Sequence, residues 1–233
     1  MVEEQSYEMV EENGQTIMKK VVKQRIHNRS LYFLTHEEAK KLKDTALTFG
    51  TDRANQYYAI ISLGINVGLR RKEIANLNIK QVNLKDKYIQ LGIDTKTRES
   101  RIIPIQDDLK KTLIMLIGTR TDGYVILHKS RKDSKRSYSE VQINNIVAQI
   151  GKRADIKPKG GIYNSDGKFL EGMKNINPHL LRHSWAKFCQ LAGIEKNITR
   201  VMGGWKNNKM LDEIYGTPSM ETMLEEGGKK MNW

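Results

Sequence analysis

The stretch that most constrains the fold is ANQYYAIISLGINVGL, an apolar run that Thr51 opens and Gly68 stops. It has no charged face, and a helix that is apolar on all sides is stable only when other elements cover it. The helix before it begins at Thr35, which stands at capping-box spacing from Glu38, and ends at the glycine that precedes Thr51. We therefore predict that the second of these helices lies in the core of a globular domain.

The later segments indicate one small sheet among further helices. Strand-like composition occurs in three short segments separated by charged turns, QVNL, KYIQLGI and SRIIPI, which predicts an antiparallel sheet. Helices are expected in RKEIANL and at 107–117, 139–153, 178–192, 195–202 and 208–215. Basic loops, HKSRKDSKR and the glycine-rich IKPKGGIYNSDGK, connect them. The predicted fold class is mainly α with a small antiparallel β-sheet (α+β).

Charge and cysteine content narrow the class of protein. A formal net charge of +13 and a pI near 9.7 favour a polyanionic partner, either nucleic acid or an anionic membrane surface. No apolar run reaches the length of a membrane span and the start, MVEEQSYEMVEE, is acidic, so we expect no membrane segment, no signal peptide and a cytoplasmic location. Cys189 is the only cysteine, which excludes an internal disulfide and a thiolate-rich zinc site.

The segment NPHLLRHSWA, residues 177–186, has the pattern of an anion site. Asn177 is a good N-cap, and Pro178 suits the first helical position. His179 and Arg182 then fall three residues apart, on one face, beside backbone N–H groups that the start of a helix leaves unpaired. The first turns of this helix are therefore a place to hold an anion.

Three further segments hold polar or cationic residues where the apolar pattern does not predict them. They are GLRRKEI with Arg70 and Glu73, the hairpin turn DTKTRE with Lys96, and GGWKNNKMLDEIYG with Trp205 and Tyr215. Together with the segment His179-Leu180-Leu181-Arg182-His183, they stand in the order of the motifs of the tyrosine recombinases, the phage-integrase family of DNA-breaking and rejoining enzymes. From about residue 31 to residue 216 the chain resembles the catalytic domain of that family.

The resemblance implies how the chain is organised. Residues 31–216 are expected to form the catalytic domain. Residues 1–30, where an acidic start gives way to KKVVKQRIHNR, are expected to be a basic, flexible linker or arm, too short for the helical domain with which the family clamps the other face of DNA. The tail, residues 217–233, carries Met220, Met223 and Leu224 at helical spacing. It either completes the chain's own core or, as the resemblance implies, docks on a neighbouring protomer.

The residue types suit in-line attack on a phosphodiester. Such attack builds negative charge on the non-bridging oxygens, and the paired donors of Arg70 and Arg182 match that charge and its geometry. His179 could accept the proton of the nucleophile or donate to the phosphate, whereas the indole N–H of Trp205 can only donate.

The resemblance implies the remaining roles. Tyr215 is the nucleophile that forms a covalent 3′-phosphotyrosine, and Lys96 is the general acid for the leaving 5′-oxygen. Glu73 and His183 are supporting residues behind the groups that touch the phosphate. Because no P-loop segment, two-metal carboxylate cluster or HExxH segment occurs, no metal, ATP or other cofactor is expected.

The expected function is that of a site-specific DNA recombinase or integrase, encoded by a phage or mobile element or acting on a prokaryotic nucleoid. Its expected partners are double-stranded DNA, further copies of itself in a homotetramer on two DNA sites, and accessory DNA-bending or directionality proteins. No membrane partner is expected.

Several alternatives stay open. A type IB topoisomerase uses a similar set of groups, and a basic RNA-binding protein also fits the net charge. A catalytically weak DNA-binding protein with this fold fits the ten positions from Trp205 to Tyr215, one more than the family spacing. At single residues, His179 and His183 could be half of a zinc site, Trp205 a packing residue and Tyr215 an ordinary half-buried tyrosine.

Overall fold

The chain forms two compact units, which we describe separately. The larger unit comprises Tyr32–Pro158 and Lys174–Trp233, and the smaller comprises Met1–Leu31 and Lys159–Met173. The computed structural model describes ten segments of the chain, residues 6–12, 15–21, 28–29, 33–92, 100–128, 136–157, 161–163, 169–172, 175–209 and 211–212.

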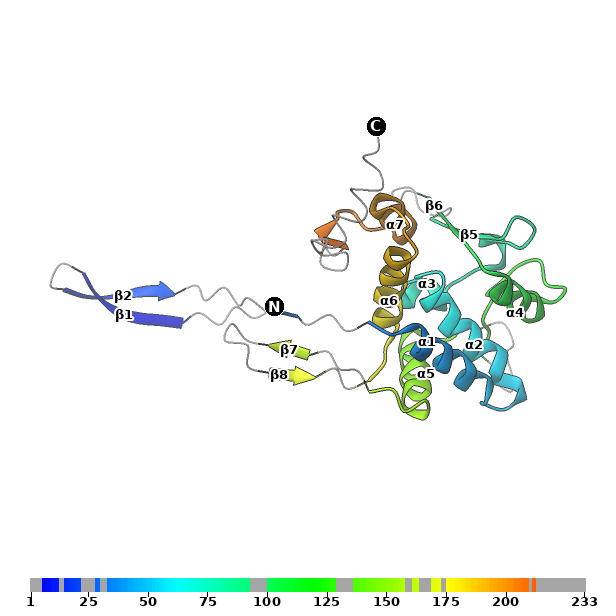
Figure 1. Cartoon of the computed structure of the whole chain (residues 1–233), viewed down its shortest axis with the longest axis horizontal. Helices are drawn as coiled ribbons and strands as arrows, with labels where there is room; N and C mark the ends of the chain where they lie inside the picture. The colour runs from blue at the N-terminus through cyan, green and yellow to red at the C-terminus, as the bar shows by residue number, and fades with distance from the viewer. Residues whose placement is uncertain are drawn as a thin grey trace, which may run out of the picture. The chain divides into compact units, whose positions relative to one another are not determined.

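In its described residues, the larger unit is helical with one small sheet (Figure 1), which confirms the predicted fold class. Its helices are α1 His36–Leu47, α2 Thr51–Ile65, α3 Arg71–Ala75, α4 Asp107–Ile117, α5 Glu140–Arg153, α6 Pro178–Leu191 and α7 Lys196–Gly203. A 3₁₀ turn, Ile79–Gln81, leads into a three-stranded antiparallel sheet made of β4 Val82–Asn83, β5 Tyr88–Leu91 and β6 Arg101–Pro104. All three strands lie where the composition predicts them.

The helix α2 lies at the centre of this unit, as its apolar sequence predicts. Ile60, Ile61 and Leu63 are fully buried, and α2 contacts α1, α4, α5 and α6. The approach of α6 is especially close, because a Cβ atom on Gly64 would lie 2.8 Å from Cδ1 of Leu181. Burying each such aliphatic side chain stabilises the fold by about 1.5–3 kcal/mol.

The predicted helix starts are confirmed by their caps. The Thr35 hydroxyl accepts from the backbone N–H of Glu38, and the Glu38 carboxylate accepts from the backbone N–H of Thr35. Asn177 caps α6 in the same sense, because its side-chain oxygen accepts from the backbone N–H of Leu180 at 2.9 Å. Each cap satisfies a donor that the helix leaves unpaired, and its removal typically costs about 1 kcal/mol.

The smaller unit contains strands in the ranges where a basic arm and a glycine-rich loop are expected. β1 Ser6–Glu12 and β2 Gln15–Val21 form an antiparallel hairpin, and β3 Asn28–Arg29, β7 Gly161–Tyr163 and β8 Phe169–Gly172 form a second sheet in the order β3-β7-β8. In the register of β1 and β2, Glu8 lies across from Lys19, and Val10 lies across from Ile17. Asn-Gly, the sequence at 13–14 between the two strands, is a strong hairpin signal.

Two further observations complete the fold. Of the helix predicted at 208–215, Lys209, Leu211 and Asp212 are helical, and residues 210 and 213–215 lie outside the described part of the chain. None of the helices in the described segments is both long enough and apolar enough to cross a bilayer.

Candidate active site

The helix α6 carries its two predicted site residues at very different depths. His179, in the first turn, is exposed, whereas Arg182, one turn later, is only 2% exposed. Arg182 is held inside by hydrogen bonds to main-chain carbonyl groups. Its Nη1 donates to the carbonyl oxygen of Gly68 at 2.5 Å, and its Nη2 donates to that of Gly203. The guanidinium carbon also lies 4.2 Å from the centre of the Trp205 ring.

Burial has a clear electrostatic effect on this arginine. Loss of water, with a smaller contribution from the positive charge of Arg70, lowers the pKa of Arg182 to about 9. The group therefore still carries its charge at neutral pH. A buried cation of this kind is stabilised by any anion that replaces the lost water.

Two glycines make the hydrogen bonds of Arg182 sterically possible. Gly68 has φ +69°, and a Cβ there would lie 2.2 Å from Cε3 of Trp185. On Gly203 a Cβ would lie 2.1 Å from Cζ3 of Trp205. The two indole rings, which are stacked 5.9 Å apart, thus occupy the space where side chains of these residues would stand. Replacement of either glycine would displace an acceptor of the buried arginine.

Arg70, the residue before α3, also contacts the end of α7. Its Nη1 donates to Oε1 of Glu73 at 2.9 Å, and its Nη2 donates to the carbonyl oxygen of Gly204 at 2.6 Å. The backbone N–H of Arg70 also donates to Oε2 of Glu73, so the Glu73 carboxylate accepts from both the main chain and the side chain of Arg70. The Arg70 side chain remains 42% exposed. It is therefore open to solvent, whereas Arg182 is buried.

Arg101, on β6, belongs to the same cluster and is not among the residues that the sequence indicates. Its Nη2 donates to Oε1 of Glu73 at 2.7 Å, and its Nε donates to the carbonyl oxygen of Met202 at 2.9 Å. One signal for it exists. Arg101 shares a strand face with Ile103, which is 1% exposed, so an arginine stands where the alternation of the strand demands a buried residue.

Glu73 stands between two of these arginines. Burial acts to raise its pKa, but the charge and hydrogen bond of Arg101, together with Arg70, outweigh burial and hold the pKa of Glu73 below its usual value. Glu73 is therefore ionised at neutral pH. Glu73 hydrogen-bonds to both Arg70 and Arg101, and its supporting role in a reaction stays a prediction.

The two histidines of α6 lie in contact. Nε2 of His179 and Nε2 of His183 are 2.8 Å apart, so one ring donates and the other accepts, according to the tautomer. His183 is 9% exposed and lies one turn beyond the exposed His179. Within the described segments, no three His, Cys, Asp or Glu side chains are grouped closely enough to share a metal ion.

The structure brings together part of the predicted site. Arg70, Glu73, Arg182 and Trp205 converge around the end of α7, and the histidine pair lies on the same helix as Arg182. Lys96 and Tyr215 lie outside the described residues. The strand residues Leu91 and Arg101, which are paired in the ladder, stand near either side of the segment that carries Lys96.

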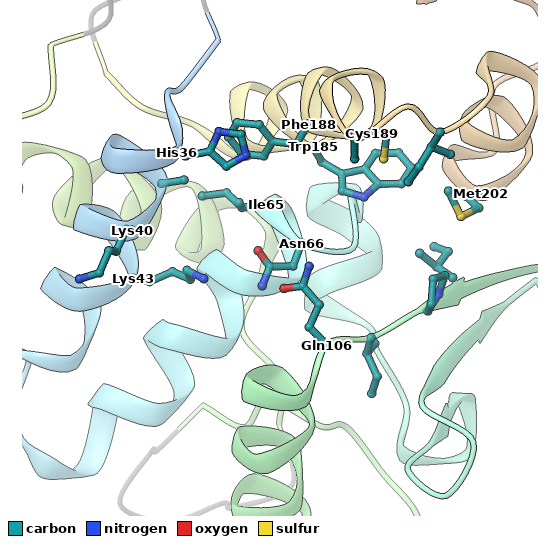
Figure 2. Close-up of a pocket in the computed structure, with 16 residues that line it drawn as sticks. His36, Lys40, Lys43, Ile65, Asn66, Gln106, Trp185, Phe188, Cys189 and Met202 are labelled. Atoms are coloured by element: carbon teal, nitrogen blue, oxygen red, sulfur yellow. The ribbon is translucent and has the colours of Figure 1, made fainter. Parts of the chain in front are cut away.

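A separate groove lies beside this cluster. It has a volume of about 420 Å³, and Figure 2 shows apolar side chains such as Trp185, Phe188 and Met202 in it, with Lys40 and Lys43 on α1. Among the predicted catalytic residues that the structure describes, none lines it. Trp185 lines the groove and also reaches the cluster, because its ring stacks on that of Trp205 and lies next to Gly68.

Several characterised proteins have sequences similar to this one over most of the chain. It is 27% identical over 172 residues to the tyrosine recombinase XerA of Pyrococcus furiosus, a match that covers 73% of this chain and 52% of that protein. It is 25% identical over 197 residues to the tyrosine recombinase XerC of Thermodesulfovibrio yellowstonii, covering 83% and 60%. With the integrase of Salmonella phage P22 it shares 23% identity over 186 residues, covering 79% and 43%. The chain thus spans about half the length of these relatives.

Solved structures show the same fold. The crystal structure of XerA recombinase matches with a TM-score of 0.61 and 20% identity, covering 87% of this chain and 66% of that one. The Tn1549 transposon integrase in complex with circular intermediate DNA matches with a TM-score of 0.64 and 16% identity, covering 84% and 66%. The XerH recombinase bound to difH in a pre-cleavage complex matches with a TM-score of 0.63 and 17% identity, covering 96% and 59%.

The family model describes most of the chain. The model of the phage integrase family matches residues 32–222, a span that contains every residue of the candidate site. This match agrees with the order of the motifs and with the fold. The chain belongs to the phage integrase family, the tyrosine recombinases.

Proposed function

We propose that this chain is the catalytic part of a site-specific DNA recombinase, which cuts and rejoins DNA strands through a covalent 3′-phosphotyrosine intermediate. The observation that carries the proposal is the convergence of two arginines from separate elements on adjacent carbonyl groups. Arg70 and Arg182 donate to the carbonyl oxygens of Gly204 and Gly203, beside the ring of Trp205. Such a pair is suited to hold one phosphate between a buried and an exposed cation.

The charge of the cluster favours an anion. Three arginine cations surround the single carboxylate of Glu73, so the cluster keeps a net positive charge. Of these cations, Arg182 has lost its water and Arg70 faces solvent, from which DNA would approach. Charge that develops on the phosphate during in-line attack would therefore meet donors that are already oriented. The indole N–H of Trp205 is a further candidate donor.

Tyr215 is the proposed nucleophile, and the site must help to remove its phenol proton. A free phenol with a pKa near ~10 is about one part in a thousand ionised at pH 7, a deficit of roughly 4 kcal/mol. The positive cluster lowers that cost, and His179 can accept the phenol proton, with His183 fixing its tautomer from behind. Lys96 is the proposed donor of a proton to the leaving 5′-oxygen. The phosphotyrosine conserves the energy of the broken ester, so a 5′-hydroxyl can reverse the step.

The partners follow from the same reaction. The Tn1549 integrase and XerH structures contain DNA, and we propose double-stranded DNA as the substrate of this chain. Exchange between two duplexes requires four protomers, hence a homotetramer on two sites, with accessory proteins that bend DNA or set direction. A phage or mobile-element integrase acting in the cytoplasm of a prokaryote fits this set of partners.

The tail, residues 217–233, is proposed to dock in the apolar groove of a neighbouring copy. Its Met220, Met223 and Leu224 stand at helical spacing among acidic residues, and the groove combines apolar side chains with Lys40 and Lys43. Deletion of 217–233 should then abolish assembly of several protomers on DNA while one protomer still binds a single site, measured by gel-shift stoichiometry. Unchanged assembly would contradict docking between protomers.

A suicide substrate tests the proposed function. Nicked duplex carrying the recombination site is incubated with the protein in EDTA and denatured in SDS, and a DNA-linked band is expected. The band should disappear in Tyr215→Phe while DNA binding persists, and it should persist in the control Tyr58→Phe, whose hydroxyl pairs with Asp108 instead. Dependence on a metal ion, or an adduct that survives Tyr215→Phe, would contradict the mechanism.

The same preparation separates the remaining alternatives. A topoisomerase of type IB would relax supercoiled DNA and reseal the same strand, so relaxation without exchange between duplexes would favour it. A DNA-binding protein of this fold without catalysis would bind and leave no covalent product. A recombinase is expected to join strands from two labelled duplexes.

A further inference from the structure

The end of α7 presents three consecutive carbonyl oxygens, and each accepts a hydrogen bond from a different arginine. The pairs are Met202 with Nε of Arg101 at 2.9 Å, Gly203 with Nη2 of Arg182, and Gly204 with Nη2 of Arg70 at 2.6 Å. The three arginines come from three different places in the chain, β6, α6 and the residue before α3. One short turn therefore fixes the spacing between them.

The physical reason is the polarity of a helix. The last carbonyl groups of a helix lack partners within it and form the negative end of its dipole, so cations are stabilised there. Arginine is well suited to this place, since its five N–H donors can serve a carbonyl group and a second partner together. All three arginines use that property here.

Arg101 differs from the other two in where its donors go. Its side chain is 11% exposed, and its hydrogen bonds with Met202 and Glu73 hold the guanidinium between α7 and the carboxylate. The Glu73 oxygen that it contacts, Oε1, is also the acceptor of Nη1 of Arg70. Arg70, in contrast, is 42% exposed and has donors left over for a ligand.

We infer that Arg101 is a positioning residue for Arg70, acting through Glu73 and through the Met202–Gly204 turn, and that it does not itself contact the phosphate. This inference rests on the proposed function only in taking a DNA phosphate as the ligand of Arg70. Arg101 also begins β6, the strand that follows the segment with Lys96. The same contacts therefore tie that end of the hairpin to the arginine pair.

The conformation of Gly204 supports this arrangement. Its φ of +64° is a left-handed conformation that favours glycine, and a Cβ there would lie 2.9 Å from Nη1 of Arg101. Gly193 is a matched control, because it also follows a helix, has φ +72°, and has nothing within 4 Å of a Cβ position. Alanine at the two positions brings similar backbone strain, and only Gly204→Ala disturbs Arg101.

The first test needs no DNA. The carboxyl pKa of Glu73 is measured by NMR titration in Arg101→Gln and in the control Arg71→Gln, whose side chain pairs with Glu140 instead. The charged groups that influence Glu73 are Arg70, Arg101 and Arg182. Arg101→Gln should raise the Glu73 pKa and Arg71→Gln should leave it unchanged. Equal titration of Glu73 in the unmodified protein and in Arg101→Gln would overturn the inference.

The second test asks whether Arg101 acts through Arg70. Arg101→Gln should slow formation of the DNA adduct by about 100-fold at unchanged DNA affinity, as expected when a reacting group is misplaced by about 1 Å. The double variant Arg70→Gln with Arg101→Gln should be no slower than Arg70→Gln alone, because coupled residues are not additive. Multiplied losses would mean that Arg101 acts independently, and the inference would be wrong.

The glycine pair keeps the test decisive if Arg101→Gln does not fold. Gly204→Ala should raise the Glu73 pKa and slow the adduct, and Gly193→Ala should do neither; equal behaviour of the two would overturn the inference. The two proposals fail in different ways. If the Glu73 pKa rises in Gly204→Ala but the unmodified protein forms no adduct, the proposed function is refuted and the positioning network is supported. If Gly204→Ala forms the adduct at an unchanged rate, the proposed function is supported and the positioning inference is refuted.

Discussion

Gly68→Ala is the substitution whose cost the structure defines most closely. Its φ of +69° lies in the left-handed region, where an L residue costs about 1–2 kcal/mol. The new Cβ would also lie 2.2 Å from Cε3 of Trp185, far inside normal contact, and overpacking of this kind costs about 1–3 kcal/mol. The expected loss in the free energy of unfolding is therefore about 2–5 kcal/mol.

Gly193→Ala separates the two contributions. Gly193 has φ +72° and open space at its Cβ position, so this variant carries the backbone strain without the overlap. The difference between the variants should be about 1–3 kcal/mol, or roughly 2–12 °C in Tm at the 2–4 °C per kcal/mol typical of a domain of this size. Urea and thermal unfolding of both variants measure it.

Gly68→Ala should affect function as well as stability. The carbonyl oxygen of Gly68 accepts from Arg182 at 2.5 Å, so displacing it should slow adduct formation even at temperatures where the variant is folded. Gly193→Ala should form adduct at the unmodified rate. Equal Tm values for the two variants would refute the steric reasoning, and a normal adduct rate in folded Gly68→Ala would refute the link to Arg182.

Four further predictions concern stability and binding. Because the pKa of Glu73 is lowered in the folded state, its charge contributes stability above the ordinary carboxyl pKa of about 4.3, and that stability is lost as pH falls through the lowered value. Glu73→Gln should therefore cost stability at pH 7 and progressively less below about pH 4, measured by urea unfolding across pH. Tyr58→Phe removes a 2.7 Å hydrogen bond to Asp108 and should cost about 1 kcal/mol in the same assay, with Tyr88→Phe as comparison. Ser139→Ala removes the side-chain cap of α5 and should also cost about 1 kcal/mol, visible as a lower urea midpoint; no change would mean that the cap is replaced. DNA affinity should fall linearly on a log–log plot against salt concentration, measured by fluorescence anisotropy, and a flat plot would exclude phosphate contacts as the main source of affinity.

Local signals in the sequence account for the helices. Thr35 with Glu38, and Asn177 with Pro178, mark the starts of α1 and α6, because the side-chain caps depend only on neighbours a few residues away. The small sheet follows from the composition of its strands. The hairpin of β1 and β2 is weaker in apolar period, and its register, with Glu8 across from Lys19, is evident only once two separate segments are compared.

The contacts that arrange the arginines of the site could not be predicted from the sequence. The order of motifs predicts Arg70, Arg182 and Trp205 as site residues. The burial of Arg182, however, depends on Gly68 and Gly203, which approach it from other parts of the fold. Arg101 has no motif of its own to mark it. Its importance comes from meeting Glu73 and the end of α7, and such tertiary contacts leave no local signal beyond an arginine on a buried strand face.

The most direct test of the proposed mechanism is mass spectrometry of the DNA-linked peptide from the suicide-substrate adduct. We predict one modified peptide, with the DNA joined through its 3′-phosphate to the side-chain oxygen of Tyr215. A 5′-linked adduct, or attachment at any other residue, would contradict the assignment of the nucleophile and with it the reaction proposed for the arginine cluster.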